Sequence, residues 1–284
     1  MSENKIYLCA ISNIESGTCN EDCKFCTQSV KYKADIQRYR RKEIEDIVKE
    51  AIIARKNRAI GFCLVTAGTG LDDKRLDYVC RAASAIKKEL GDELSLIACN
   101  GIATLDQLKE LKKHGIENYN HNLETAQEFY NEICTTHPWE DRYQTCLNAK
   151  EAGLQLCTGG IFGLGETQEN RISMLKSIAS LEPMSVPINF FHPNEAFPIV
   201  KNSISREEAF ELIKLSREYL PNQMIMIAGG RELMFKEQEY DVFKYGANAL
   251  VVGDYLTTAG KTAQEDIDAI EALGYEIALD CKSR

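Results

Sequence analysis

The sequence predicts an α/β protein that folds over residues 1–284 as one domain, a single (β/α)8 barrel of TIM type. The first observation is that short apolar runs rich in β-branched residues alternate with longer segments of helical periodicity. The second is that no Pro/Ser-rich linker, low-complexity tract or charge block divides the 284 residues. Uninterrupted βα alternation requires a parallel sheet, and eight such units favour closure into a barrel. A doubly wound open sheet is the alternative.

The expected elements follow one another in strict order. The strands are residues 6–12, 60–67, 94–100, 117–123, 154–160, 186–191, 224–228 and 249–253. The helices are residues 42–58, 74–90, 105–114, 140–152, 168–181, 206–220, 236–245 and 263–273. Four helices are preceded by a Ser or Thr suited to the N-cap, namely Thr104, Thr167, Ser205 and Thr262. Four helices are followed by a glycine, which takes positive φ without strain, namely Gly91, Gly115, Gly153 and Gly246.

Composition excludes several classes of protein. The chain has 34 basic and 43 acidic side chains, a net charge of −9, which argues against a nucleic-acid partner because phosphate binding uses clustered Lys and Arg. No apolar run approaches the roughly 20 residues of a membrane span. The first residues show no secretory signal, so we expect a cytoplasmic protein. There are 11 cysteines, an odd and high number, which in a reducing compartment indicates metal ligands or redox groups.

Three cysteines lie close together on the loop that follows the first expected strand. Cys19, Cys23 and Cys26 have the spacing C-x3-C-x2-C. Thiolates suit iron–sulfur clusters or zinc, but a structural zinc site needs four ligands, and the nearest other cysteines are Cys9 and Cys63. Three thiolates on a cubic cluster would leave one iron open for a ligand. A zinc site with a distant fourth ligand, or thiols without metal, are the alternatives.

A second group of cysteines is spread over separate strands. Cys63, Cys99 and Cys157 fall in the second, third and fifth expected strands. Arg231, which we place on the seventh strand, is the candidate for a fourth member of this group. A single strand cysteine usually acts as a small buried hydrophobe. Three of them on barrel strands therefore leave two readings open, a second metal site or ordinary core packing.

The triad spacing, with the aromatic Phe25 before its third cysteine, resembles the signature of radical S-adenosylmethionine enzymes. Within that superfamily the chain resembles the biotin synthase family over essentially its whole length. The matching stretches are residues 19–29, 119–125, 157–167, 185–189, 228–232 and 256–258. The resemblance implies a 4Fe–4S cluster on Cys19, Cys23 and Cys26. It also implies a 2Fe–2S cluster deeper in the barrel on four residues, Cys63, Cys99, Cys157 and Arg231.

The same resemblance assigns the remaining site residues. Asn120, Asn122 and Glu124 alternate on the fourth strand, so they share one face. The residues implied at S-adenosylmethionine are Phe25, Asn122, Glu124, Arg142, Gly163 and Gly165. The residues implied at the substrate dethiobiotin are Asn120, Asn122, Asn189, Thr257 and Thr258. The family's usual residue at position 124 is Asp, so the longer Glu is a departure. Without the resemblance, the asparagine row is a polar lining and the glycine-rich turn is weak evidence for a ligand.

The resemblance therefore predicts radical-mediated insertion of sulfur into dethiobiotin to form biotin, with the 2Fe–2S cluster as the sacrificed sulfur source. It also implies a homodimer and an electron donor such as flavodoxin or ferredoxin. A related barrel enzyme, such as a hydrogenase-cluster maturase or a methylornithine synthase, is the second enzyme hypothesis. A non-catalytic iron–sulfur sensor or carrier is the hypothesis from another class. Cys9, Cys80, Cys134, Cys146 and Cys281 match no motif, and His137 shows no ligand spacing.

Overall fold

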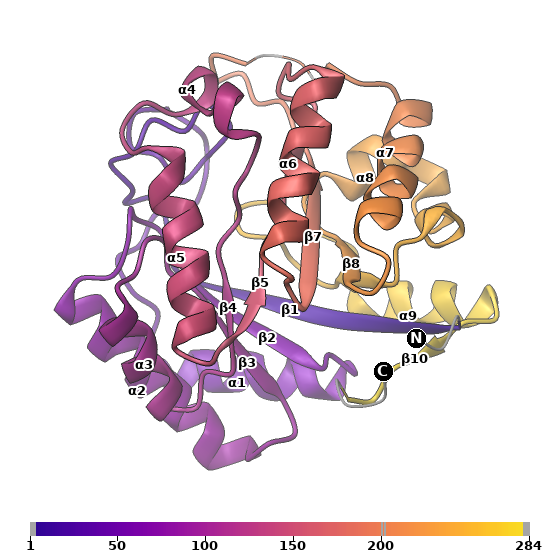
Figure 1. Cartoon of the computed structure of the whole chain (residues 1–284). Coiled ribbons are helices and arrows are strands. Elements are labelled where there is room, and N and C mark those ends of the chain that lie inside the picture. The colour runs from indigo at the N-terminus through magenta and orange to yellow at the C-terminus, as the bar shows by residue number, and fades with distance from the viewer. Residues whose placement is uncertain (1–3, 200, 202, 281–284) are drawn as a thin grey trace.

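The computed structural model describes residues 4–199, 201 and 203–280, and its strands close into a parallel barrel (Figure 1). The strands in ring order are β1 (Lys5–Glu15), β2 (Gly61–Thr66), β3 (Ser95–Cys99), β4 (Asn118–Asn120), β5 (Gln155–Cys157) with β6 (Gly160–Phe162), β7 (Ser185–Phe190), β8 (Met224–Ile227) and β9 (Ala249–Val251). Closure comes from the pairing of β1 with β9. Both β5 and β6 pair with β7, so together they form the fifth strand of the barrel, interrupted between Cys157 and Gly160. The predicted barrel is confirmed, and the open sheet is excluded.

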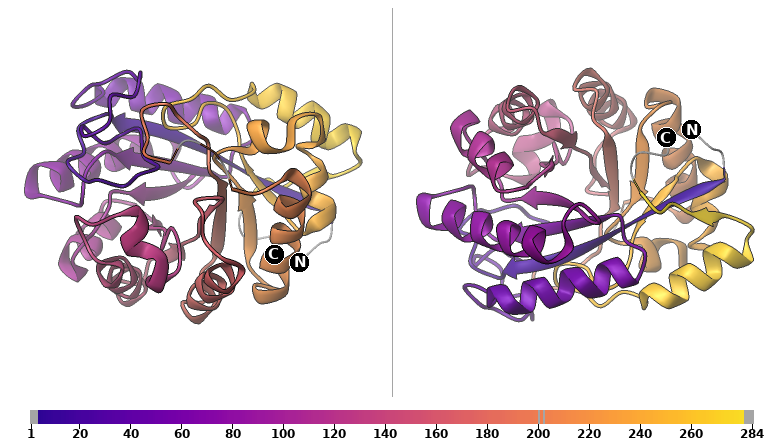
Figure 2. Two further views of the ribbon diagram at one scale, coloured as in Figure 1. Left: turned by 90° about the horizontal axis from the view of Figure 1, so that it is seen from above. Right: turned by 90° about the horizontal axis from the view of Figure 1, so that it is seen from below.

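Helices surround the ring of strands when the molecule is viewed along the barrel (Figure 2). They are α1 (Ile44–Lys56), α2 (Asp73–Leu90), α3 (Leu105–Lys113), α4 (Tyr130–Ile133), α5 (Trp139–Glu151), α6 (Gln168–Ser180), α7 (Arg206–Tyr219), α8 (Arg231–Phe235) and α9 (Ala263–Ala272). Short 3-10 turns occur at η1 (Gln127–Phe129), η2 (Lys236–Gln238) and η3 (Asp241–Tyr245). Of the described helices, none is long and apolar enough to cross a bilayer.

The predicted caps are present. The side chains of Thr104, Thr167, Ser205 and Thr262 each accept a hydrogen bond from a backbone N–H in the first turn of the following helix. Each such cap satisfies an N–H that has no partner inside the helix. The glycines that follow four helices have positive φ, with Gly246 at 106°. These local signals hold because they depend only on neighbouring residues.

Two expectations about elements were wrong. The predicted helix 236–245 is instead η2 and η3, preceded by the five-residue α8. Gly230 and Lys236 both take positive φ, which stops α8 at each end. The second error is β10 (Glu276–Ile277), which the pattern did not indicate and which adds to the edge of β1 near its start.

Alternation along the strands divides the apolar residues into two sets. Outward side chains such as Leu8, Phe62 and Leu96 pack against the helices in the main core. Inward side chains, among them Cys9, Cys63 and Met226, form a second, smaller cluster inside the barrel. Because successive strand residues point to opposite faces, β1, β2 and β8 each contribute to both sets. The smaller set forms part of the wall of a cavity.

Candidate functional site

The cysteine triad lies on the loop that follows β1 at the carboxyl end of the barrel. Backbone hydrogen bonds fix this loop, with Cys19 N–H donating to Gln28 at 3.1 Å and Cys26 N–H donating to Cys23 at 3.1 Å. The side chain of Gln28 also accepts from Gly17 N–H at 2.6 Å. Cys19 and Cys23 are buried and Cys26 is half-buried. The loop therefore presents its three thiols from a defined backbone, as the spacing predicts.

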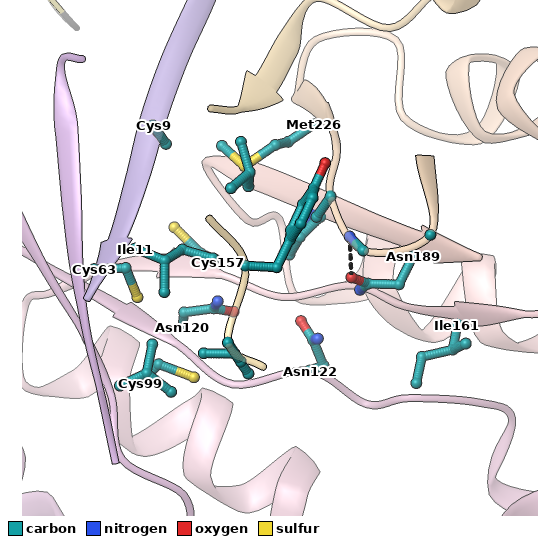
Figure 3. Close-up of a pocket in the computed structure, with 18 of the residues that line it drawn as sticks. Cys9, Ile11, Cys63, Cys99, Asn120, Asn122, Cys157, Ile161, Asn189 and Met226 are labelled. Atoms are coloured by element: carbon teal, nitrogen blue, oxygen red, sulfur yellow. Dashed lines mark hydrogen bonds between the residues drawn. The ribbon is translucent and has the colours of Figure 1, made fainter. Parts of the chain in front are cut away.

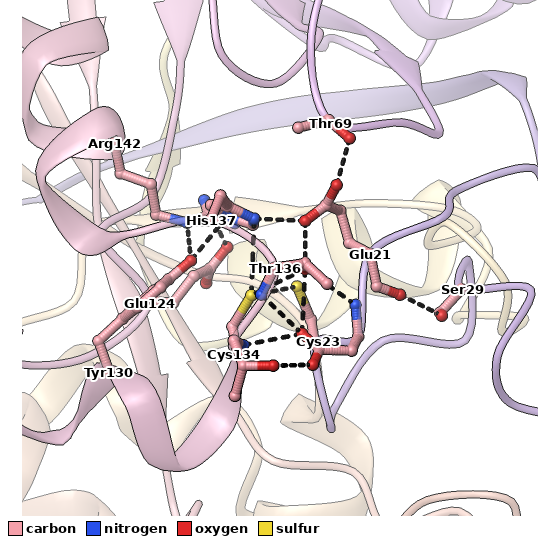
Figure 4. A network of polar contacts seen from close by, with 12 residues as sticks. Glu21, Cys23, Ser29, Thr69, Glu124, Tyr130, Cys134, Thr136, His137 and Arg142 are labelled. Atoms are coloured by element: carbon pink, nitrogen blue, oxygen red, sulfur yellow. Dashed lines mark hydrogen bonds and ion pairs between the residues drawn. The ribbon is translucent and has the colours of Figure 1, made fainter.

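Residues that sequence reasoning left out complete the surroundings of Cys23 (Figure 4). Cys134 Sγ, just after α4, lies 3.6 Å from Cys23 Sγ, and His137 Nδ1 lies 3.5 Å from Cys134 Sγ. His137 Nδ1 is also 2.5 Å from a carboxylate oxygen of Glu21. Cys23, Cys134 and His137 are close enough together to hold a metal ion. Neither Cys134 nor His137 matches a motif in the sequence, and they reach Cys23 because the segment after α4 folds back onto the triad loop.

Burial controls the charge of these thiols. It raises the pKa of Cys19 and raises the pKa of Cys26 to about 12. A hydrogen bond to Cys134, together with burial, raises the pKa of Cys23, whereas the same hydrogen bond lowers the pKa of Cys134. The triad is therefore mainly protonated without metal, and binding of a metal requires loss of these protons.

A cavity of about 390 Å³ occupies the barrel beneath the triad loop. Cys26 lines its outer end, and the strand cysteines Cys63, Cys99 and Cys157 line its inner wall (Figure 3). A hydrogen bond to Cys99, reinforced by burial, holds the pKa of Cys63 well above its usual range. Ser185 Oγ lies 2.8 Å from Cys157 Sγ and donates to it. The structure therefore brings Cys26 of the triad and all three strand cysteines to one cavity.

The asparagine row starts at the level of the strand cysteines, because Asn120 on β4 pairs with Cys157 on β5, and it continues outward past the end of β4. Asn120 on β4, and Asn122 and Glu124 beyond its end, all line the cavity, as their alternation predicts. His121 is 4% exposed and lies outside this lining. Asn120 Oδ1 is buried and has no hydrogen-bond partner among the described residues. A buried amide oxygen in this state points to a ligand that supplies a donor.

Glu124 and Arg142 form a buried charged pair at the outer end of the cavity. Arg142 Nη1 lies 3.5 Å from Glu124 and donates to the Asn122 carbonyl at 3.0 Å. Burial raises the pKa of Glu124 despite this arginine. Glu124 also takes φ 68°, a conformation that is uncommon for residues other than glycine. The surrounding structure thus holds this carboxyl in a fixed position.

The glycine-rich turn that contains Gly163 and Gly165 binds the carboxylate of Glu166 and does not line the cavity. Gly163 and Gly165 take φ 96° and 105°. The carboxylate of Glu166 accepts hydrogen bonds from Gly163 N–H at 2.9 Å and Leu164 N–H at 2.7 Å. Glu166 is itself paired with Arg171 at 2.8 Å. Neither glycine is among the described residues that line the cavity, so their role toward S-adenosylmethionine stays a prediction.

The four other predicted contacts do line the cavity. Asn189 on β7 accepts from Gly229 N–H at 2.9 Å and donates to the Gly160 carbonyl at 3.2 Å, so its amide joins β6 to the turn after β8. Thr257 Oγ1 lies 2.8 Å from Thr27 Oγ1, which connects the loop after β9 to the triad loop. Thr258 and Phe25 complete this outer part of the lining. Loops distant in sequence thus meet over the cavity.

Arg231 is not on a strand, and this expectation was wrong. It is the first residue of α8, and it is 1% exposed. Its guanidinium donates to Asp266 on α9 at 2.8 Å and 3.2 Å and lies 3.2 Å from Glu232. Gly229 and Gly230 separate it from β8, so it leaves the barrel wall and enters the helical layer. Within the described part of the chain, the cavity lining does not include Arg231.

We expect Arg231→Ala to lower the free energy of unfolding by about 3–5 kcal/mol, because it leaves the buried Asp266 carboxylate without its partner. Urea unfolding of the full chain measures this loss. Arg81→Ala is the matched control, because its ion pair with Asp77 is 56% and 66% exposed, and such pairs contribute about 1 kcal/mol or less. Equal stability of the two variants would contradict the structural role of Arg231.

Two family models match the chain. The Radical SAM superfamily matches residues 14–178, and the Biotin and Thiamin Synthesis associated domain matches residues 187–276. Both lie inside one closed barrel, since β1 from the first part pairs with β9 from the second.

Solved structures with a similar fold include the FeFe-hydrogenase maturase HydG from Carboxydothermus hydrogenoformans. It has a TM-score of 0.83 at 21% identity, covering 98% of this chain and 68% of that one. A methylornithine synthase structure has a TM-score of 0.83 at 20% identity, covering 97% of this chain and 84% of that one. At these identities the likeness concerns the fold alone.

Curated relatives give a closer match. The chain is 82% identical to the biotin synthase of Aliarcobacter butzleri, with 99% of each chain covered. It is 64% identical to the biotin synthase of Nitratiruptor sp., with 98% of this chain and 99% of the relative covered. The chain therefore belongs to the biotin synthase family of radical S-adenosylmethionine enzymes.

Proposed function

We propose that this enzyme inserts sulfur into dethiobiotin to form biotin, with all reactants held in the one barrel cavity. The observation that carries the proposal is the order of groups along that cavity. The strand cysteines line the inner wall, Asn120 pairs with Cys157 at that level, Asn122 and Glu124 follow beyond the end of β4, and Cys26 lines the cavity from the loop after β1. A substrate bound at the amides would lie between the two groups of thiols.

Membership of the radical S-adenosylmethionine superfamily implies a 4Fe–4S cluster and S-adenosylmethionine. The triad fits the cluster, because three soft thiols project from one hydrogen-bonded loop. We propose Cys19, Cys23 and Cys26 as its ligands. We also assign the binding of S-adenosylmethionine to Phe25, Asn122 and Glu124, which line the cavity, together with Arg142, Gly163 and Gly165, which lie outside its lining.

A 2Fe–2S cluster is the finer part of the proposal. Cys63, Cys99 and Cys157 come from three strands and line one wall, and thiols are the usual ligands of such a cluster. The hydroxyl of Ser185 donates toward Cys157, and hydrogen bonds to sulfur are one of the means by which proteins set cluster potentials. These residues fit an iron–sulfur group better than a hard cation, which prefers oxygen ligands.

The bound groups supply reductive cleavage of S-adenosylmethionine to a carbon radical at the first cluster and sulfide at the second. The protein supplies position and enclosure. Asn120 and Asn122 offer amide groups to the ureido ring of dethiobiotin, and Asn189 holds β6 against the turn after β8. Arg142 fixes the Glu124 carboxyl by its ion pair, and this carboxyl would accept hydrogen bonds from the ribose of S-adenosylmethionine. Thr257, paired with Thr27, joins the loops above the cavity and limits the entry of water.

We expect Asn120→Ala to weaken dethiobiotin binding by about 1–3 kcal/mol, or roughly 5- to 150-fold, because a buried amide no longer meets the ligand. Anaerobic calorimetric titration of the reconstituted enzyme measures the affinity. Asn222→Ala, at an exposed position, is the matched control. An affinity equal to that of the control would remove Asn120 from the substrate site.

The electron donor and the assembly state extend the proposal. Reductive cleavage consumes electrons from outside the chain, and we assign their delivery to a small carrier such as flavodoxin or ferredoxin. We also propose a homodimer, as the family resemblance implies. Light scattering on the reconstituted protein tests the dimer, and reduction by each purified carrier tests the donor.

Mass spectrometry of the products tests the function as a whole. Anaerobically reconstituted protein is incubated with dethiobiotin, S-adenosylmethionine and dithionite, and the expected products are 5′-deoxyadenosine, methionine and biotin. Cleavage of S-adenosylmethionine without biotin would favour another barrel enzyme, such as a maturase. Absence of cleavage would favour a non-catalytic iron–sulfur protein.

A further inference from the structure

The inner cysteine wall lacks the arginine that was expected to complete it. Arg231 is held by Asp266 in the helical layer, and the residues of β8 and the turn after it that line the cavity are Met224, Met226, Ala228, Gly229 and Gly230. Within the described residues, the cavity wall near the three strand cysteines gains a fourth thiol instead. That thiol belongs to Cys9 on β1.

Strand register places Cys9 beside the other cysteines. Cys9 pairs with Gly61 on β2 and with Val251 on β9, and Ile11 pairs with Cys63. Cys9 and Cys63 therefore point to the same inner face of neighbouring strands, in diagonal positions where side chains still meet. Figure 3 shows Cys9, Cys63, Cys99 and Cys157 around one space, with Met226 on β8.

The absence of a side chain at Gly61 leaves space for Cys9 Sγ on the inner face of the barrel. A Cβ at position 61 would lie 3.0 Å from Cys9 Sγ, tighter than nearly all real contacts. A side chain at position 61 would therefore require Cys9 Sγ to shift by a few tenths of an ångström. In addition, Cys9 and Cys63 belong to the same buried cluster inside the barrel, and Cys99 packs against that cluster.

The chemistry of the possible fourth ligands differs. A thiolate is the usual protein ligand of iron–sulfur clusters. A thioether such as Met226 carries no charge, and the protonated guanidinium of Arg231 has no lone pair to offer and is neutralised by Asp266. Cys9 can become a thiolate by giving up its proton when iron binds, as the other three must.

We propose that Cys9 is the fourth protein ligand of the inner iron–sulfur cluster, in place of Arg231. The inference rests on the proposed inner cluster and changes its ligand set to four cysteines on β1, β2, β3 and β5. Met226 packs beside the cluster, and Arg231 ties α8 to α9. An additional thiolate makes the cluster more negative than an arginine ligand would, which lowers its reduction potential.

The test is reconstitution of the full chain with ⁵⁷Fe, followed by Mössbauer quantification of each cluster type and measurement of bound iron and sulfide. Cys9→Ala is compared with Cys80→Ala, a buried helix cysteine outside the cavity, and with Met226→Leu. We expect Cys9→Ala to lose most of the inner-cluster signal while the triad cluster stays. Cys9→Ser is expected to retain part of the inner cluster with altered Mössbauer parameters, since a hydroxyl is a weaker ligand. Cys80→Ala is expected to match the unsubstituted enzyme. Met226→Leu removes the thioether beside the cluster and is expected to keep the inner-cluster signal, because Met226 is not a ligand.

Pulsed electron paramagnetic resonance on the reduced inner cluster gives an independent reading that needs no substitution. Protein labelled with ¹⁵N-arginine is expected to give the same hyperfine spectrum as unlabelled protein, because no arginine nitrogen is bound. A labelled spectrum with ¹⁵N coupling, or a Cys9→Ala protein with a full inner cluster, would overturn the inference and leave the proposed function standing. An unsubstituted enzyme that assembles no second cluster would overturn both.

Discussion

Cys23→Ala is expected to abolish formation of 5′-deoxyadenosine, lowering the rate by about 100-fold or more, which corresponds to at least about 2.7 kcal/mol in the barrier. The proposed first cluster has only three ligands from the triad loop, so loss of one leaves it incompletely held. The measurement is the amount of 5′-deoxyadenosine released by anaerobically reconstituted enzyme with dithionite as reductant.

The neighbouring thiol requires a second variant. Cys134 Sγ is 3.6 Å from Cys23 Sγ and is a possible replacement ligand when Cys23 is removed. The double variant Cys23→Ala/Cys134→Ala eliminates that route, and Cys80→Ala controls for loss of a buried thiol. Cleavage at the normal rate by the double variant would show that Cys23 does not hold the cluster.

Cys157→Ser is expected to lose most of the inner cluster and all biotin formation while the first cluster survives. Cys157 lies on β5 inside the barrel, whereas the triad lies on a loop after β1, so the two sites have separate supports. The serine hydroxyl occupies the same place but is a poor ligand for iron. Mössbauer quantification of both clusters, together with a biotin assay, measures the effect.

The two readouts separate a sulfur-donor role from simple misfolding. We expect 5′-deoxyadenosine to form in Cys157→Ser although biotin does not, because the triad remains intact. Cys80→Ser, in α2, is the matched control and is expected to behave as the unsubstituted enzyme. A Cys157→Ser protein with a complete inner cluster and normal biotin output would remove the sulfur-donor site from this enzyme.

The sequence alone determined the barrel and the presence of the triad. Short apolar runs and capping residues such as Thr104 and Thr167 act through neighbours within a few positions. The strands and caps that they predict are therefore present in the structure. The alternation of Asn120, Asn122 and Glu124 likewise predicted a shared face, and all three line the cavity. The family of the enzyme also followed from motifs printed in the sequence.

Tertiary structure decided which other residues reach the site. Arg231 looked like a strand residue, but the positive φ of Gly230 starts α8 there and carries the guanidinium to Asp266. Cys134 and His137 reach Cys23 only because α4 packs against the triad loop from more than 100 positions away, as the separation of 111 residues between Cys134 and Cys23 shows. Such contacts leave no local pattern.

The position of Cys9 in the cavity wall also could not be predicted from the sequence. Its sequence neighbours mark it as a strand residue, but nothing local says which face of β1 turns inward or what lies across from it. Closure of β1 onto β9 and its register with Gly61 decide both. Local periodicity fixed the elements because it reflects short-range geometry, whereas the composition of the cavity wall depends on strand register and barrel closure, which join residues distant in the chain.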